Sequence, residues 1–257
     1  MSIPITDTHT HIYSEAFDED QDAMMQRAIA AGVTRFFVPA IDSTYTASMH
    51  TIQSRYPEHV HLMMGLHPTH VKEDYKEELN HVREQLDAYK YVAVGEIGID
   101  LYWDKTFIKE QTEAFRTQIE WAKEKSLPIV IHCRDAFDEV FEVLEDEKGA
   151  NLSGIFHCFT GTYEQANRAI NCGMKLGIGG VVTFKNGKID TFLSQIDLRH
   201  IVLETDAPYL APVPFRGKRN ESAYILQVIE KVATIYNTST TEIIEQTTRN
   251  SIAVFGI

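Results

Sequence analysis

Asp7-Thr8-His9-Thr10-His11 follows a short apolar run, Ile3-Pro4-Ile5, near the start of the chain. If that run is a β-strand, successive side chains point to opposite faces, so His9 and His11 share one face. Neutral imidazole is the commonest metal ligand among side chains, and a pair on a rigid strand end can hold one ion. The pair alone is a weak signal, because many His-x-His pairs are only packed or solvated. Its meaning depends on the rest of the chain.

Apolar runs of strand length alternate with helical stretches along the remaining sequence. Further strands are expected at residues 33–39, 60–66, 91–96, 129–132, 154–157, 174–178 and 200–204. Helices are expected at 18–31, 44–55, 109–125, 138–147 and near 223–236, of which 109–125 and 138–147 are the clearest. Residues 240–257 are expected to form one further helix and an end segment that closes the barrel. Eight strand–helix units in about 250 residues predict an α/β fold of the TIM type, a (β/α)8 barrel, with residues 1–257 as a single domain. No Gly-x-Gly-x-x-Gly follows the first strand, which disfavours a dinucleotide-binding fold.

The composition is that of an acidic protein with ample material for a core. The chain has 24 basic and 37 acidic residues, a formal net charge of −13, and 44% aliphatic and aromatic residues. This charge argues against a broad basic footprint on a polyanion and leaves a local positive site, such as bound cations, for an anionic substrate. The cysteines show no disulfide-type spacing, and neither a signal-like start nor an apolar run of bilayer length is present. We therefore expect a cytoplasmic protein that has no membrane association and no obligate protein partner.

Ionisable residues recur where the expected strands end. In a TIM-type barrel the active site is built at this end of the strands. The residues that fall there are His9, His11, His67, Glu96, His132, His157 and Asp206. If the barrel forms, they converge on one mouth although they are spread over the chain.

Glu96 and two cysteines next to candidate ligands also have simpler interpretations. Glu96 would be costly to bury unpaired, so it needs either a metal ion or a salt bridge, for which Arg134 is the alternative partner. Cys133 and Cys158 each follow a candidate ligand, and strand alternation turns both away from the barrel interior, which predicts packing roles.

His67 precedes Pro68 and could be a turn residue. The other four imidazoles and the two carboxylates exceed what one catalytic ion needs, since such sites commonly use three protein ligands. A pair of divalent ions uses the set better, with one carboxylate between the ions. We expect His9, His11 and Asp206 to hold one ion. We expect His132 and His157 to hold the other, with Glu96 as the bridge.

The order of these motifs resembles the TatD family of metal-dependent hydrolases, a branch of the amidohydrolase-like barrels. The resemblance covers nearly the whole chain and rests on Asp7–His11, Gly65–Pro68, Gly95–Asp100, His132–Arg134, Phe156–Gly161, Glu204–Leu210 and Pro212–Glu221. It implies a divalent-metal-dependent deoxyribonuclease that trims DNA, single-stranded or at a strand end, from the 3′ end. It also implies metal ligation by His9, His11, Glu96, His132, His157 and Asp206. Ser222 departs from the proline that relatives often have and removes no catalytic group.

This ligand set suggests a mechanism in which metal-activated water attacks phosphorus. Asp206 would orient the water or accept its proton, and Glu96 would bridge the ions. Arg134 would offset charge on the phosphoryl oxygens, and His67 would contact the phosphate. Arg216 and Asn220, in the loop after the last strand, are weaker candidates for phosphate binding. Imidazole-rich ligation suits zinc, manganese, iron or nickel, whereas magnesium, on which the family depends, prefers oxygen ligands.

Two alternatives remain open. The same machinery can hydrolyse an amide, a lactone or an aminoacyl ester on tRNA, and the fold does not choose among them. A non-catalytic metal-binding or interaction protein is the other alternative, but its sign would be a lost ligand, and here the set is complete.

Overall fold

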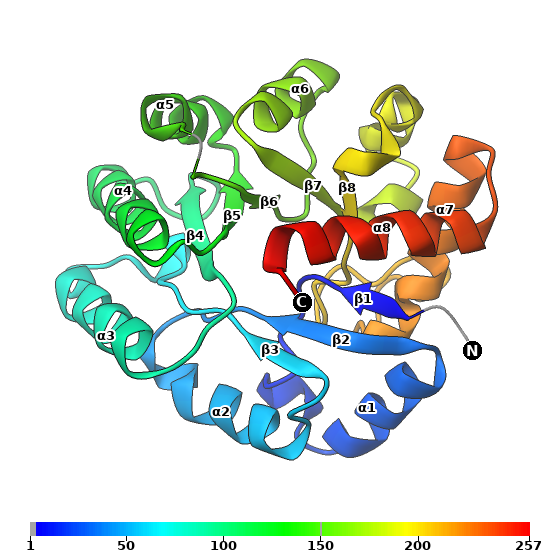
Figure 1. Ribbon diagram of the computed structural model, residues 1–257, viewed down its shortest axis with the longest axis horizontal. Coiled ribbons are helices and arrows are strands. Elements are labelled where there is room, and N and C mark those ends of the chain that lie inside the picture. The colour runs from blue at the N-terminus through cyan, green and yellow to red at the C-terminus, as the bar shows by residue number, and fades with distance from the viewer. Residues whose placement is uncertain (1–3, 150) are drawn as a thin grey trace.

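The eight strands run parallel around a central axis, with helices on the outside (Figure 1). The structure is a computed structural model that describes residues 4–149 and 151–257. The strands are β1 (Ile5–Asp7), β2 (Val33–Val38), β3 (Val60–Leu62), β4 (Val94–Asp100), β5 (Ile129–Arg134), β6 (Gly154–Phe156), β7 (Met174–Ile178) and β8 (Ile201–Leu203). The helices are α1 (Gln21–Ala30), α2 (Thr46–Arg55), α3 (Tyr75–Ala88), α4 (Ile108–Lys125), α5 (Phe137–Glu147), α6 (Tyr163–Asn171), α7 (Ile225–Tyr236) and α8 (Thr240–Phe255). The predicted TIM-type barrel is confirmed.

Two hydrogen-bonded seams join the sheet β1-β2-β3 to the sheet β4-β5-β6-β7-β8. Between β3 and β4, the Gly95 amide donates to the Met64 carbonyl at 3.0 Å. Between β8 and β1, the Thr8 amide donates to the Leu203 carbonyl at 3.0 Å. The sheets therefore close on each other, and no strand edge needs other protection.

The barrel interior has an apolar layer that α8 covers from one end. Inward-facing side chains form a cluster of their own, namely Phe37, Met63, Ala93, Val130, Ile155, Val202 and Phe255. The Phe255 ring stacks on Phe37 at 3.8 Å between centroids. The Asn250 amide donates to the Leu198 and Ile201 carbonyls, at the amino end of β8. Helix α8 thus closes the amino end of the barrel, and it crosses the front of the barrel in Figure 1.

Strand β4 is placed differently from its expectation at 91–96, because it begins at Val94 and continues to Asp100. The continuation depends on Gly98, whose φ of 143° is unusual for other residues. A Cβ there would lie 2.0 Å from the His132 carbonyl oxygen, so only glycine lets β4 and β5 approach. The expected strand at 60–66 is shorter, ending at Leu62.

Among the helices of the described part of the chain, none is both long and apolar enough to cross a bilayer.

Candidate metal centre

Inside the barrel, the apolar layer is followed by a polar layer at the carboxyl end of the strands. Val130 and Ile155 belong to the apolar cluster. His132 lies two residues after Val130, and His157 lies two residues after Ile155. Residues two apart on a strand share a face, so these imidazoles also point into the barrel. The same parity leads from Val202 to Glu204, a carboxylate that the sequence analysis did not select.

Glu96 lies at the centre of the polar layer and is nearly fully buried. Its Oε2 lies 3.1 Å from His9 Nε2 and 3.8 Å from His11 Nε2. Its Oε1 lies 2.8 Å from His132 Nδ1 and 3.8 Å from His157 Nε2. The two oxygens therefore face different pairs of imidazoles. Arg134, the alternative partner weighed for Glu96, forms no ion pair with it.

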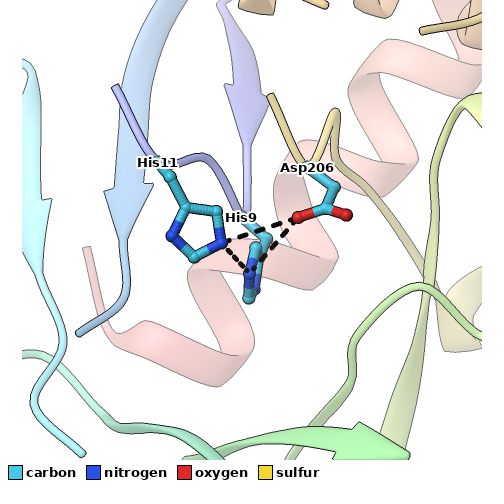
Figure 2. A group of neighbouring side chains, drawn as sticks. All are labelled: His9, His11 and Asp206. Carbon is cyan, nitrogen blue, oxygen red and sulfur yellow. Dashed lines mark hydrogen bonds and ion pairs between the residues drawn. The ribbon is translucent and has the colours of Figure 1, made fainter. Parts of the chain in front are cut away.

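His9, His11 and Asp206 form one side of this layer (Figure 2). His9 Nε2 and His11 Nε2 lie 3.3 Å apart, and Asp206 Oδ1 lies 3.9 and 3.6 Å from them. The Asp206 amide donates to the His9 carbonyl at 2.9 Å, which ties the loop after β8 to the end of β1. Asp206 has a φ of 57°, a region that aspartate tolerates better than most residues. His9 and His11 are far from Asp206 in the sequence, and the hydrogen bonds between β8 and β1 bring the three residues together.

Each of three imidazoles has a second contact that fixes its orientation. The Tyr13 hydroxyl donates to the Pro39 carbonyl, so it accepts from His11 Nδ1 at 3.0 Å and leaves Nε2 as the free ligand atom. Asp100 Oδ2 lies 2.8 Å from His132 Nε2. Partners of this kind set the tautomer and basicity of metal-binding histidines.

Glu204 is the corresponding partner of His157. Its Oε1 lies 3.0 Å from His157 Nδ1 and accepts from the Cys158 amide at 2.5 Å. A Cβ on Gly177 would lie 2.3 Å from Glu204 Oε2, so glycine in β7 makes room for this carboxylate. Glu204 and Asp100 are the site residues that sequence reasoning missed, and inward parity along β8 was the available signal for Glu204.

The charges of the polar layer shift one another's pKa values. Burial acts to raise the pKa of Glu96, but His67, His9 and His157 outweigh it and hold that pKa well below its usual value. Burial acts to lower the pKa of His157, but Glu204, Glu96 and Asp206 raise it to about 10. Burial lowers the pKa of His67 to about 4. Glu96 thus carries its charge, as a ligand of a cation must.

These donor atoms fit divalent metal ions. Three groups converge within 4.8 Å, namely His9 with His11 and Asp206, His9 with Glu96 and His157, and His67 with Glu96 and His132. His9 Nδ1 has no hydrogen-bond partner among the described residues, although it is buried. Imidazole nitrogens with carboxylate oxygens are the ligands that zinc and other transition metals favour.

A fourth convergent group corrects one sequence interpretation. Cys158 was expected to face away from the barrel interior, but it borders the pocket and lies with His157 and Glu204. Strand β6 already ends at Phe156, and Cys158 has a φ of 42°, so strand alternation no longer applies there. Cys133 also borders the pocket, although it packs partly against the core outside the barrel.

A cavity of about 560 Å³ borders the polar layer. Of the four predicted substrate-binding residues, two line this cavity and two do not. His67 and Arg134 line it, whereas Arg216 and Asn220 do not. The Arg216 guanidinium lies 4.0 Å from the centroid of the Phe184 ring.

Asn220 is engaged within its own loop. Its side chain is buried and donates to the Thr205 and Tyr209 carbonyls, and its Oδ1 accepts from the Glu221 amide. These bonds occupy its amide within the loop after β8.

Similarity to known proteins agrees with this geometry. A family model described as TatD related DNase matches residues 6–256. The uncharacterized metal-dependent hydrolase YabD of Bacillus subtilis (strain 168) is 39% identical over 253 residues, which cover 98% of each chain. The 3′-5′ ssDNA/RNA exonuclease TatD of Pantoea ananatis (strain LMG 20103) is 28% identical over 257 residues, covering 98% of this chain and 99% of that one.

A solved structure shows the same agreement in three dimensions. The crystal structure of YJJV, a TatD homolog from Escherichia coli k12, superposes with a TM-score of 0.93 at 28% identity, and the match covers 100% of both chains. The chain therefore belongs to the TatD-related DNase family and is a metal-dependent hydrolase.

Proposed function

We propose that this protein is a deoxyribonuclease that removes nucleotides from the 3′ end of a single DNA strand, with two divalent ions held by His9, His11, Glu96, His132, His157 and Asp206. The observation that carries the proposal is the position of Glu96. One of its oxygens faces His9 and His11, and the other faces His132 and His157. A carboxylate between two groups of imidazoles is what a two-ion site uses. The exonuclease named among the relatives supports the substrate class.

The residues of the pocket have separate tasks in this reaction. Bound divalent ions supply Lewis acidity, which lets water attack phosphorus at neutral pH. Asp206 Oδ1, 3.8 Å from His157 Nε2, orients the attacking water and takes its proton. As water bonds to phosphorus, the bond from phosphorus to the 3′ oxygen of the shortened strand breaks, and that oxygen leaves with a proton from solvent. Arg134 at the cavity wall faces the charge that develops on the phosphoryl oxygens, and His67 contacts the phosphate. Arg216 lies outside the cavity, where a phosphate further along the strand can reach it.

The ions we propose are zinc, manganese, iron or nickel, with magnesium less suited to the imidazole nitrogens. Elemental analysis of the purified protein identifies the bound metal and its stoichiometry. Two equivalents of metal per chain support the paired site, and a single equivalent that sustains full activity contradicts it.

The test of the proposed function is a nuclease assay on end-labelled single-stranded DNA, with and without a chelator. Asp206→Asn should lower kcat by about 10²- to 10⁴-fold, the usual contribution of a general base. Asp197→Asn, at an exposed carboxylate near the amino end of β8, serves as the control and should match the wild type.

Parallel assays on an aminoacyl-tRNA, a simple ester, a lactone and an amide test the other bond classes. Faster metal-dependent turnover of any of these than of DNA would overturn the proposal.

A further inference from the structure

Two exposed aromatic side chains stand directly after β4, beside the mouth of the pocket. Tyr102 is 52% exposed and Trp103 is 69% exposed, and Trp103 borders the cavity. Their ring centroids lie 4.9 Å apart in an edge-to-face arrangement. Aromatic rings contribute most when they leave water, so two of them exposed together beside a pocket indicate a surface that a ligand covers.

The backbone of this pair is held by a residue that also orients the metal centre. Asp100 Oδ1 accepts hydrogen bonds from the Tyr102 and Trp103 amides at 3.0 and 3.1 Å. The other oxygen of Asp100 contacts His132 Nε2 at 2.8 Å. The aromatic pair is therefore fixed in position relative to the metal-binding residues.

Arg134 stacks on the same pair. Its guanidinium carbon lies 3.7 Å from the centroid of the Tyr102 ring and 5.3 Å from that of Trp103. Within residues 4–149 and 151–257, Arg134 forms no ion pair, whereas Arg27 and Arg83 each bind carboxylates. In a chain with a net charge of −13, an arginine that faces ring surfaces and no carboxylate keeps its N–H groups available for an anion.

We propose that Tyr102, Trp103 and Arg134 form a binding site for an unpaired nucleobase of the DNA strand, adjacent to the phosphate that is cleaved. The inference rests on the proposed function and adds to it how the strand is held. Aromatic faces beside a cation bind single strands by stacking, which tolerates any base because every base has a π-face. An acidic protein can in this way hold a strand end without a basic groove.

Trp103 can report this contact directly, because the chain has only 2 tryptophans. Trp121, the other one, packs against the core in α4, so Trp121→Phe leaves Trp103 as the sole tryptophan. We would titrate this variant, as purified with its metal, with an eight-residue oligothymidylate whose phosphorothioate linkages resist hydrolysis. Stacking should quench the fluorescence of Trp103 in a saturable manner. An abasic strand of the same length should not quench it.

The energetic test compares binding of the same oligonucleotide by variants. Trp103→Ala should weaken binding roughly 5- to 150-fold, as expected for loss of one base–aromatic stack, and Trp103→Phe should restore most of it. Tyr89 is 55% exposed at the end of α3, on the amino side of the barrel, so Tyr89→Ala is the matched control and should bind as the wild type does.

Two outcomes would overturn the inference. One is equal binding by the wild type and Trp103→Ala. The other is a fluorescence change that follows protein concentration and not oligonucleotide, which would assign the surface to a second copy of the chain. Failure of the proposed function looks different: the oligonucleotide would quench Trp103 although the metal-loaded protein cleaves no DNA.

Discussion

Glu204 lies outside the proposed ligand set but contacts one of its members, His157. Its carboxylate is fully buried and lies against His157 Nδ1, which leaves Nε2 of that ring facing Glu96. A carboxylate behind a metal-binding histidine fixes the ring and raises its basicity. Glu204 is thus a positioning residue for His157.

Glu204→Gln should lower metal affinity about 10- to 100-fold, because the amide keeps the shape of the side chain but not its charge. The measurement is a competition titration against a chelating indicator. Glu147→Gln is the control, since Glu147 is a partly buried carboxylate at the end of α5 that pairs with Lys123 of α4. Unchanged affinity in Glu204→Gln, or an equal loss in both variants, would contradict the positioning role.

At the scale of elements, the loop after β8 is fastened to α1 by a network of charges. Arg219 Nη1 lies 2.6 Å from Asp20 Oδ1, and Arg27 Nη2 lies 2.6 Å from Glu221 Oε2. Arg27 also contacts Asp20 at 2.9 Å. Asp206 lies near the start of the same loop, and the network ties the far end of that loop to α1.

The network makes part of the stability depend on pH. Hydrogen bonds from Arg219 and Arg27 hold the pKa of Asp20 below its usual value. The folded protein therefore binds fewer protons there than the unfolded chain, and this contribution is present above about pH 4 and lost as pH falls further. Asp20→Asn should lower the free energy of unfolding at pH 7 by about 1 kcal/mol, because Asp20 is partly exposed and solvent screens the pairs.

Urea unfolding of both proteins at pH 7 and at acid pH measures this effect. The difference between wild type and Asp20→Asn should shrink on acidification, since the wild type then loses the same interaction. Glu19→Gln, at an exposed carboxylate in the same segment, should show no such difference. A difference in unfolding free energy between wild type and Asp20→Asn that stays constant with pH would contradict this role of Asp20.

At the scale of the whole molecule, the barrel has a structural end and a chemical end. Phe255 of α8 is 8% exposed and stacks on Phe37 at the amino end. Phe255→Ala should destabilise the fold by about 3 kcal/mol, through lost burial and the cavity left behind. Ile252→Ala on the same helix, at a side chain that is 39% exposed, should cost less than about 1 kcal/mol.

Urea unfolding measures both changes. Because the metal centre lies at the opposite end, folded Phe255→Ala should keep the kcat of the wild type. A large loss of kcat in protein that is still folded would mean that the two ends are not independent.

The net charge of −13 also predicts how DNA binding responds to salt. If only one or two phosphates are held by protein cations, the slope of log K against log salt concentration should be about −0.7 to −1.4 for a single strand. Arg134→Gln should reduce that slope by about 0.7, whereas Arg199→Gln, at an exposed arginine near the amino end of β8, should not change it. A slope that corresponds to many phosphates would contradict local binding.

Much of the fold and of the candidate centre could be predicted from local pattern. Alternation of apolar runs and helical stretches predicted the barrel. His9 and His11 lie side by side as expected, although β1 ends at Asp7, before either of them. The ends of β4 could not be predicted as well. A glycine at position 98 locally indicates a strand break, but in the fold it lets β4 pass close to the backbone of His132.

The sequence by itself determined the family and the barrel, and it proposed a set of metal ligands, because a periodic pattern and an ordered set of motifs are local properties of the chain. Only the tertiary structure decided which residues support them. Glu204 contacts His157, and Asn220 makes its hydrogen bonds within its own loop. The Arg134 guanidinium packs against the Tyr102 and Trp103 rings. These are contacts between segments far apart in the chain or in a loop, where no sequence period specifies the direction of a side chain. The same closure of β8 onto β1 brings Asp206 to His9 and His11, so the histidine pair gains its third partner only when the barrel is complete.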